Sequence, residues 1–235
     1  MEQMPEDWRR GIVIVAHPDD IEYGAAAAVA RWTGQGKDIR YVLVTSGEAG
    51  IAGLPPAESG PLREAEEIAA AKAVGVHQVE FLGYPDGRVE ETLQLRRDLA
   101  AAIRRHRPEL VVLFNFGDTW APGYANSADH RAVGRAALDA ISDAGNEWIF
   151  PDLAEEPWSA RWGAIAGPKA THAVDVTANI DQATASLSEH RRYLEVLSSD
   201  PVEDQVRFIV DRATGPIEGF PAERAVGFEL YYFGG

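Results

Sequence analysis

Short, continuously apolar stretches alternate, along the first two thirds of the chain, with longer stretches in which apolar residues recur at helical spacing. The short stretches have the length and the β-branched composition of strands that are buried on both faces of a parallel sheet. They cover residues 11–16, 39–44, 79–82 and 110–114. The longer stretches predict helices over residues 25–32, 61–74 and 91–106, the second of which carries Pro61 near its first turn.

This alternation predicts an α/β fold, namely a Rossmann-like parallel sheet with helices on both faces, in three layers. Each helix must pack back against the sheet through a right-handed connection. The rest of the chain continues the pattern, with strands predicted over residues 162–166, 173–176 and 228–233 and helices over 131–144, 180–197 and 202–212. No repeat, low-complexity tract or change in composition separates these segments, so we expect a single domain over residues 1–235.

Composition and charge narrow the chemistry. The chain has no cysteine, which excludes disulfides, a thiolate nucleophile and cysteine-ligated zinc or iron–sulfur centres, so that any metal must bind nitrogen and oxygen. Its net charge of −15 would repel nucleic acid and an anionic membrane surface, and we expect neither as a partner. The first ten residues lack the apolar segment of a secretory signal, and no run reaches the roughly 18 apolar residues that span a bilayer. We therefore expect a cytoplasmic protein.

The predicted topology gathers certain loops at one edge of the sheet. Ligands of such folds bind outside the carboxyl ends of the strands. The segment His17-Pro18-Asp19-Asp20 directly follows the first strand. His17 and Asp20 offer an imidazole nitrogen and a carboxylate oxygen, and residues i and i+3 of a strand-to-helix turn can fold back toward one point. If these two hold a cation, Asp19 is placed to touch a water bound to that cation.

A third ligand is expected from the loop after the fourth strand, which reads Asn126-Ser127-Ala128-Asp129-His130. His130 is the best candidate, and Asp129 either caps the following helix or orients a histidine. Two histidines, one carboxylate and an open fourth position are the donor set of a catalytic zinc site. The competing interpretation of the first segment is a turn with a capping aspartate and no metal.

The same motifs resemble the PIG-L/LmbE-like zinc deacetylases. The resemblance extends to Thr45-Ser46-Gly47-Glu48 after the second strand and to Gly83-Tyr84-Pro85-Asp86-Gly87 after the third, and His-Pro-Asp-Asp is its most specific part. It implies hydrolysis of an N-acetyl or other N-acyl group on a glucosamine-type sugar or related small metabolite. It also implies zinc, with ferrous iron as the alternative, held by His17, Asp20 and His130, and Asp19 as the general base.

One position departs from the family pattern. Many members have His-Pro-Asp-His after the fourth strand, where the first histidine stabilises the oxyanion or protonates the amine, whereas this chain has Ser127 at that place. A hydroxyl can donate to an oxyanion but is a poor acid toward an amine. Either protonated Asp19 does both tasks or His172 enters the crevice from its far side. A packed or exposed His172 is the competing interpretation.

Three further residues are candidates for binding the substrate, each with an ordinary alternative. Glu48 could bind substrate hydroxyls or be a solvated loop carboxylate, and Arg63 could contact a sugar or be a surface arginine. Trp120 could stack on a sugar face or pack within its loop. The other histidines, His77, His106 and His190, have no neighbours that suggest ligation and are interpreted as surface or helix residues.

The sequence therefore predicts a metal-dependent amidohydrolase that acts on a small, glycosidic N-acylated amine. Two rival hypotheses remain: a non-catalytic metal- and sugar-binding protein of the same fold, and a metal-dependent enzyme that cleaves another bond, such as the amide of a thiol conjugate or an ester. The substrate, the native metal and the formation of a homo-oligomer are left open.

Overall fold

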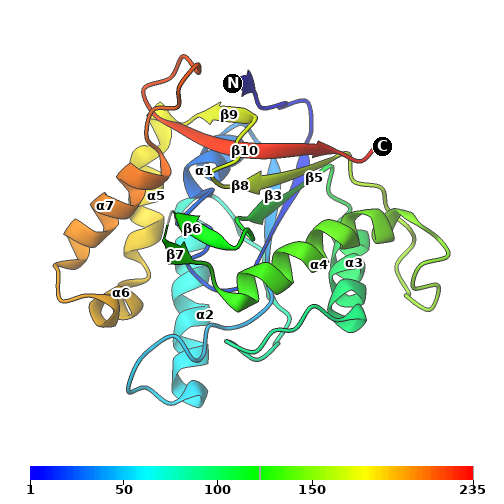
Figure 1. Ribbon diagram of the computed structural model, residues 1–235, viewed down its shortest axis with the longest axis horizontal. Coiled ribbons are helices and arrows are strands. Elements are labelled where there is room, and N and C mark those ends of the chain that lie inside the picture. Colours follow the sequence, from blue (N-terminus) through cyan, green and yellow to red (C-terminus); the bar gives the residue numbers. More distant parts are fainter. Residues whose placement is uncertain (122, 235) are drawn as a thin grey trace.

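A computed structural model describes residues 1–121 and 123–234, and its centre is an eight-stranded sheet (Figure 1). The order across this sheet is β1-β9-β10-β8-β5-β2-β3-β4. In chain order its strands are β1 (Glu2–Gln3), β2 (Arg10–Val15), β3 (Asp38–Leu43), β4 (Val79–Phe81), β5 (Leu110–Phe114), β8 (Trp162–Ala166), β9 (His172–Asp175) and β10 (Ala225–Tyr232).

The strands that are neighbours in the order β8-β5-β2-β3-β4 run parallel to one another, as the sequence predicts. The chain runs from β2 to β3 on one side and reaches β5 on the other, so the order of the sheet reverses at β2. The crevice of such a fold lies at this reversal, outside the carboxyl ends of the two strands. His17 follows β2, and the loop that ends at His130 follows β5.

The predicted α/β fold with a parallel sheet is confirmed, and β10 departs from it because it is antiparallel to both β8 and β9. An apolar pattern shows which residues of a strand are buried. It does not show the direction of the strand, because parallel and antiparallel neighbours both complete the hydrogen-bond ladder.

Helices cover both faces of the sheet (Figure 1). Val13 and Val15 of β2 face the cluster that includes α1 (Ala26–Gly34), α5 (Ile180–Ser188) and α7 (Val202–Ala213). Ile12 and Ile14 face the opposite cluster, which includes α3 (Leu93–His106) and α4 (Ala128–Gly145). This is the period-two alternation of a strand that is buried on both sides.

Several boundaries differ from the prediction. Helix α2 (Pro56–Ala73) begins five residues early, so that Pro61 lies inside it, and α4 begins directly after its capping residue Ser127. The single helix predicted over residues 180–197 is divided into α5 and α6 (Arg191–Leu197). The division buries His190, which apolar periodicity does not reveal.

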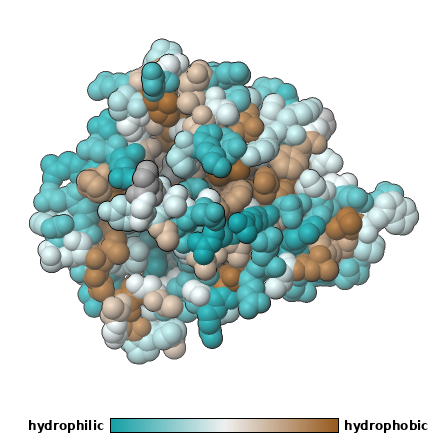
Figure 2. Space-filling model, viewed as in Figure 1, coloured by the Kyte–Doolittle hydropathy of each residue, from teal (hydrophilic) through white to brown (hydrophobic). Residues whose placement is uncertain are grey.

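Short elements were also missed. The edge strand β1 and the hairpin of β6 (Thr119–Ala121) and β7 (Tyr124–Ala125) are too short to show a pattern. A 3₁₀ turn, η1 (Thr177–Asn179), precedes α5. Among the described residues, no helix is long and apolar enough to cross a bilayer. The face in Figure 2 mixes hydrophilic and hydrophobic residues.

Candidate functional site

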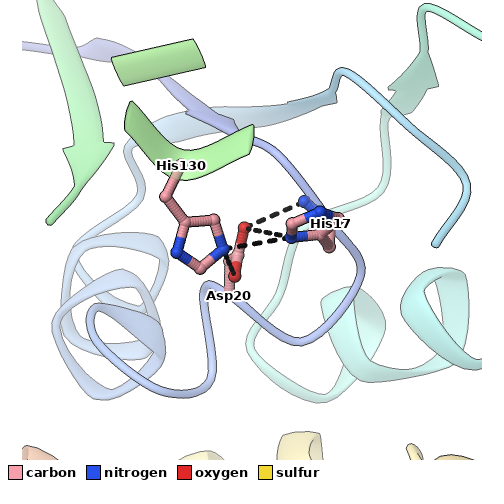
Figure 3. A group of neighbouring side chains, drawn as sticks. All are labelled: His17, Asp20 and His130. Atoms are coloured by element: carbon pink, nitrogen blue, oxygen red, sulfur yellow. Dashed lines mark hydrogen bonds and ion pairs between the residues drawn. The ribbon is translucent and has the colours of Figure 1, made fainter. Parts of the chain in front are cut away.

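The turn after β2, which carries His17 and Asp20, and the first turn of α4, which carries His130, bring these three side chains together (Figure 3). His17 Nδ1 lies 3.0 Å from His130 Nε2, and Asp20 Oδ1 lies 2.9 Å from the same His130 nitrogen. His17 Nδ1 is 3.5 Å from Asp20 Oδ2. Residues 113 positions apart in the chain thus present their ligand atoms to one point.

His130 is held by Asn126, a residue to which the sequence analysis assigned no role. Asn126 Oδ1 lies 2.9 Å from His130 Nδ1 and also accepts from the backbone N–H of Ser127. The amide nitrogen of Asn126 donates to the carbonyl oxygens of Asn115 and Gly117, which fixes the orientation of the amide. His130 Nδ1 must therefore carry the proton, and Nε2 presents a lone pair to Asp20 and His17.

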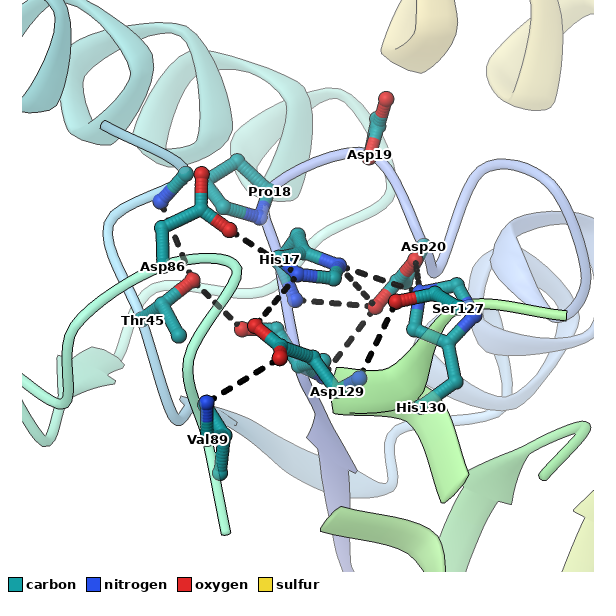
Figure 4. A network of polar contacts seen from close by, with 12 residues as sticks. His17, Pro18, Asp19, Asp20, Thr45, Asp86, Val89, Ser127, Asp129 and His130 are labelled. Carbon is teal, nitrogen blue, oxygen red and sulfur yellow. Dashed lines mark hydrogen bonds and ion pairs between the residues drawn. The ribbon is translucent and has the colours of Figure 1, made fainter. Parts of the chain in front are cut away.

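His17 is held from its other nitrogen by two carboxylates. Its Nε2 lies 3.1 Å from Asp86 Oδ1 and 3.3 Å from Asp129 Oδ2. Asp129 also accepts from the backbone N–H groups of Gly87 and Val89, so it joins the loop after β4 to the start of α4 (Figure 4). Burial acts to lower the pKa of His17, but Asp20, Asp129 and Asp86 outweigh it and raise that pKa well above its usual value. With a cation in place of the proton on Nδ1, Nε2 still donates to the carboxylates and the Nδ1 lone pair faces His130 and Asp20.

The two roles considered for Asp129 can now be separated. The cap of α4 is Ser127, whose Oγ accepts from the Asp129 N–H at 3.2 Å, and the side chain of Asp129 lies against His17. Asp86 was missed as a site residue. Its place in the turn after the third predicted strand, at the same edge of the sheet, was the available signal.

The donor set fits a divalent cation. Two imidazole nitrogens and one carboxylate converge, and the far nitrogen of each ring faces a side-chain oxygen. Burial acts to raise the pKa of Asp20, but His130 and His17 outweigh it and hold that pKa well below its usual range. Two backbone N–H groups, of Ala16 and His17, also donate to Asp20 Oδ2. A charged carboxylate is a metal ligand, and a divalent cation would take the place of the proton on His17 Nδ1.

Asp19 lies between the ligand residues but its side chain points away from Asp20 (Figure 4). Its φ of +88° is in the left-handed region, which costs a residue other than glycine about 1–3 kcal/mol. The carboxylate lies 3.3 Å from Arg63 Nη2. Burial raises the pKa of Asp19, although Arg63 acts to lower it.

Arg63 is not the surface residue that its place in a helix suggested, because only 3% of it is exposed. Its guanidinium donates to the carbonyl oxygen of Pro18 and lies over the ring of Tyr193. A Cβ atom at Gly47, where φ is +61°, would lie 2.8 Å from Arg63 Nη1. The glycine at this position therefore makes room for the arginine.

A cavity of about 1010 Å³ contains these groups. The predicted site residues on its walls are His17, Asp19, Asp20, Arg63, Trp120, Ser127 and His130. Trp120 packs edge-on against the ring of His130 at 5.0 Å between centroids. A second part of the cavity is more apolar and includes Phe208, Ile209 and Ile217.

Three predicted site residues are not on its walls: Asp129, which lies against His17, and also Glu48 and His172. Glu48 turns to accept from the backbone N–H of Asp86 at 2.8 Å, so it holds the turn after β4. His172 lies beside β1, with Nε2 3.5 Å from a carboxylate oxygen of Glu2, and the structure does not bring it to the ligand residues.

Comparison with protein families gives a match over residues 12–141, more than half of the chain, to the PIG-L model, described as GlcNAc-PI de-N-acetylase. A diacetylchitobiose deacetylase of Thermococcus kodakarensis is 30% identical over 59% of this chain and 51% of its own length. A 1D-myo-inositol 2-acetamido-2-deoxy-alpha-D-glucopyranoside deacetylase of Streptomyces avermitilis is 28% identical over 72% of this chain and 65% of its own length. The chain thus spans about half to two thirds of these relatives.

Solved structures share the fold. The N,N'-diacetylchitobiose deacetylase of Pyrococcus horikoshii superposes with a TM-score of 0.84 at 24% identity, covering 97% of this chain and 85% of that one. The 4-carboxy-2-hydroxymuconate hydratase GalB of Pseudomonas putida superposes with a TM-score of 0.70 at 21% identity, covering 95% and 96%. One fold therefore carries different reactions, and the reaction must be argued from the site.

Proposed function

The chain belongs to the PIG-L family, and on that premise we propose that it is a zinc-dependent hydrolase that removes an N-acetyl group from a small, glucosamine-type amino sugar. The names of its relatives support the substrate class, since both are deacetylases of N-acetylated glycosides. The site supports the reaction class, because two imidazoles and a carboxylate are the donor set of catalytic zinc. Ferrous iron uses the same set, and metal analysis decides between the two ions.

His17, Asp20 and His130 would hold the ion. When bound there, it supplies a water of lowered pKa and a Lewis acid for the amide carbonyl. Every other part of the reaction falls to side chains that surround these ligands in the same cavity.

Asp19 is the proposed general base. It takes a proton from the water as the water oxygen forms a bond to the acetyl carbon, a task worth roughly 10²–10⁴-fold in rate. The carbon–nitrogen bond then breaks, and Asp19 returns the proton to the departing amine, so that acetate and the free amino sugar are released. Asp19 takes the acid step as well because His172 does not line the cavity.

Ser127 is proposed to donate a hydrogen bond to the carbonyl oxygen of the acetyl group. Its Oγ already accepts a hydrogen bond from the Asp129 N–H, which leaves the hydroxyl proton available for donation into the cavity. A donor aimed at the developing oxyanion lowers the barrier. Arg63, beside Asp19, and Trp120, against the ring of His130, are proposed to bind the sugar.

One observation carries the proposal: His17 Nδ1, His130 Nε2 and the Asp20 carboxylate converge on one point, while the far nitrogen of each ring faces a side-chain oxygen. A non-catalytic sugar-binding protein would need the metal only for stability. It would not need a buried carboxylate, Asp19, on the wall of the same cavity.

The test measures metal content and acetate release in the same samples. Protein stripped of metal and reloaded with zinc is assayed on N-acetylglucosamine, diacetylchitobiose and an N-acetylglucosaminyl inositol, beside an acetylated thiol conjugate and an ester. We expect acetate only from the sugars and only after reloading. His17→Ala and His130→Ala should lose both metal and activity, whereas Asp19→Asn should keep the metal and lose activity.

His77→Ala is the matched control, because His77 is exposed and does not line the cavity. It should behave as the unaltered protein does. Full activity of the stripped protein would refute the proposal. Zinc binding without turnover of any compound would favour the binding protein, and turnover of the thiol conjugate or the ester alone would favour the other hydrolase.

A further inference from the structure

A second cluster of titratable side chains lies outside the metal-ligand set and is sealed from solvent. Glu22 in the turn after β2, Glu67 in α2 and His190 between α5 and α6 offer ligand atoms within 4.8 Å of one another. His190 Nε2 lies 3.4 Å from Glu22 Oε2 and 3.6 Å from Glu67 Oε2. The side chains of all three residues are 0% exposed.

The cluster is held by charge more than by ordinary hydrogen bonds. Glu22 Oε1 accepts from the Ser186 hydroxyl at 2.7 Å. Glu67 Oε1, Glu22 Oε2 and both ring nitrogens of His190 have no hydrogen-bond partner among the described residues. Burial lowers the pKa of His190, but the two carboxylates outweigh it and raise that pKa to about 9. A buried carboxylate is tolerated when a cation faces it.

Two residues of the cluster also form hydrogen bonds with the backbone of Asp19. Glu67 Oε2 accepts from the Asp19 N–H at 3.1 Å, and the Asp19 carbonyl oxygen accepts from the Glu22 N–H at 2.9 Å. Two members of the cluster therefore contact the backbone on both sides of the residue whose φ is +88°. A left-handed backbone is unfavourable for aspartate, so it persists only where surrounding contacts stabilise it. These two hydrogen bonds stabilise the backbone of Asp19 in that conformation.

We propose that Glu67, held in place by His190 and Glu22, is a positioning residue that fixes the left-handed backbone of Asp19 and so keeps its carboxylate beside Arg63 in the cavity. The inference rests on the proposed function only in assigning a chemical task to that carboxylate. Displacing a reacting group by about 1 Å can cost on the order of 10²-fold in rate.

Two conservative substitutions separate this role from a merely structural one. Above the raised Glu67 pKa of about 8, where the assays are run, Glu67→Gln keeps an acceptor oxygen at the same distance along the side chain and removes the negative charge. Glu67→Asp keeps the carboxylate and withdraws it by one methylene group from the Asp19 N–H. A charge or stability role predicts the larger effect for Glu67→Gln, and the positioning role predicts it for Glu67→Asp. Glu58→Gln and Glu58→Asp, at an exposed position of the same helix, are matched controls.

The measurements are kcat and KM of the zinc-loaded variants, zinc per chain, and the exchange rate of the Asp19 amide hydrogen by NMR. We expect Glu67→Asp to lose about 10- to 100-fold in kcat with KM changed less than threefold, and zinc to stay at one per chain. Its Asp19 amide should exchange at least tenfold faster. Glu67→Gln should restore slow exchange and most of kcat.

Wild-type kcat in Glu67→Asp together with slow exchange would overturn the proposal. So would two zinc ions per chain that fall to one in His190→Gln, because the cluster would then be a second metal site. If no N-acetyl sugar is turned over, the proposed function fails, and the exchange rates still decide whether Glu67 holds Asp19. If Glu67→Asp does not fold, wild-type exchange and kcat in folded His190→Gln overturn the proposal, and faster exchange with lower kcat supports it.

Discussion

Asn126 decides which nitrogen of His130 can bind a metal. Its amide is oriented by two backbone carbonyls and one backbone N–H, and the remaining bond from its oxygen places the proton on His130 Nδ1. Partners of this kind, one step removed from the metal, commonly contribute 10–100-fold in affinity. The sequence placed Asn126 in the segment that leads to His130. No local pattern shows that its side chain forms a hydrogen bond with His130, four positions later.

Asn126→Ala should therefore weaken zinc binding about 10- to 100-fold without preventing it, because the three ligands remain. A competition titration with a chelator of known affinity measures this. Asn146→Ala, at the C-terminal cap of α4 and outside the cavity, is the control and should bind zinc as before. Equal affinity in both variants would show that Asn126 does not prepare His130.

At the scale of elements, Ser127 has one task in stability and a second, proposed one in catalysis. As the cap of α4 its hydroxyl accepts from the Asp129 N–H, and Thr92 does the same for α3 by accepting from Leu95. Ser127→Ala and Thr92→Ala should each lower the free energy of unfolding by about 1 kcal/mol, measured by urea denaturation. Only Ser127→Ala should also lower kcat. An equal kcat in the two variants would remove Ser127 from the reaction.

Helix α4 also packs closely against the loop that leads to Trp120. A Cβ atom at Gly134, inside the helix, would collide with the side chain of Phe116. Gly134→Ala should therefore destabilise the protein by about 1–3 kcal/mol, although alanine favours helices. Gly34→Ala in α1 meets no atom within 4 Å and should stabilise by up to about 1 kcal/mol. Thermal unfolding of both variants tests the pair, and a stabilising Gly134→Ala would contradict it.

At the scale of the whole molecule, the sealed cluster links stability to pH. Burial raises the pKa of Glu67 from 4.5 to about 8, and the carboxylates raise that of His190 from 6.5 to about 9 against the effect of burial. In both cases the folded protein holds a proton that the unfolded chain releases at lower pH. The folding stability that protonated His190 contributes is complete below pH 6.5 and is lost as the pH rises toward 9. The folding stability that protonated Glu67 contributes is lost in the same way as the pH rises from 4.5 to 8.

The melting temperature of the zinc-loaded protein should therefore fall as the pH rises from 6.5 to 9. Zinc is kept bound so that its release does not contribute to the profile. The fall should be smaller in His190→Gln and unchanged in His77→Gln, whose side chain is exposed. A flat profile in the unaltered protein would contradict these pKa directions.

The sequence by itself determined the alternating strands and helices, the carboxyl edge at which the ligands meet, and the residues His17, Asp20 and His130. These features are local: apolar periodicity, turn composition and the donor atoms of neighbouring residues are all visible within a few positions. The tertiary structure alone decided the direction of β10, the burial of Arg63 and the sealed contact of His190 with Glu22 and Glu67. Those features depend on segments that are distant from one another in the chain, and a polar side chain is buried only when a distant partner compensates its charge.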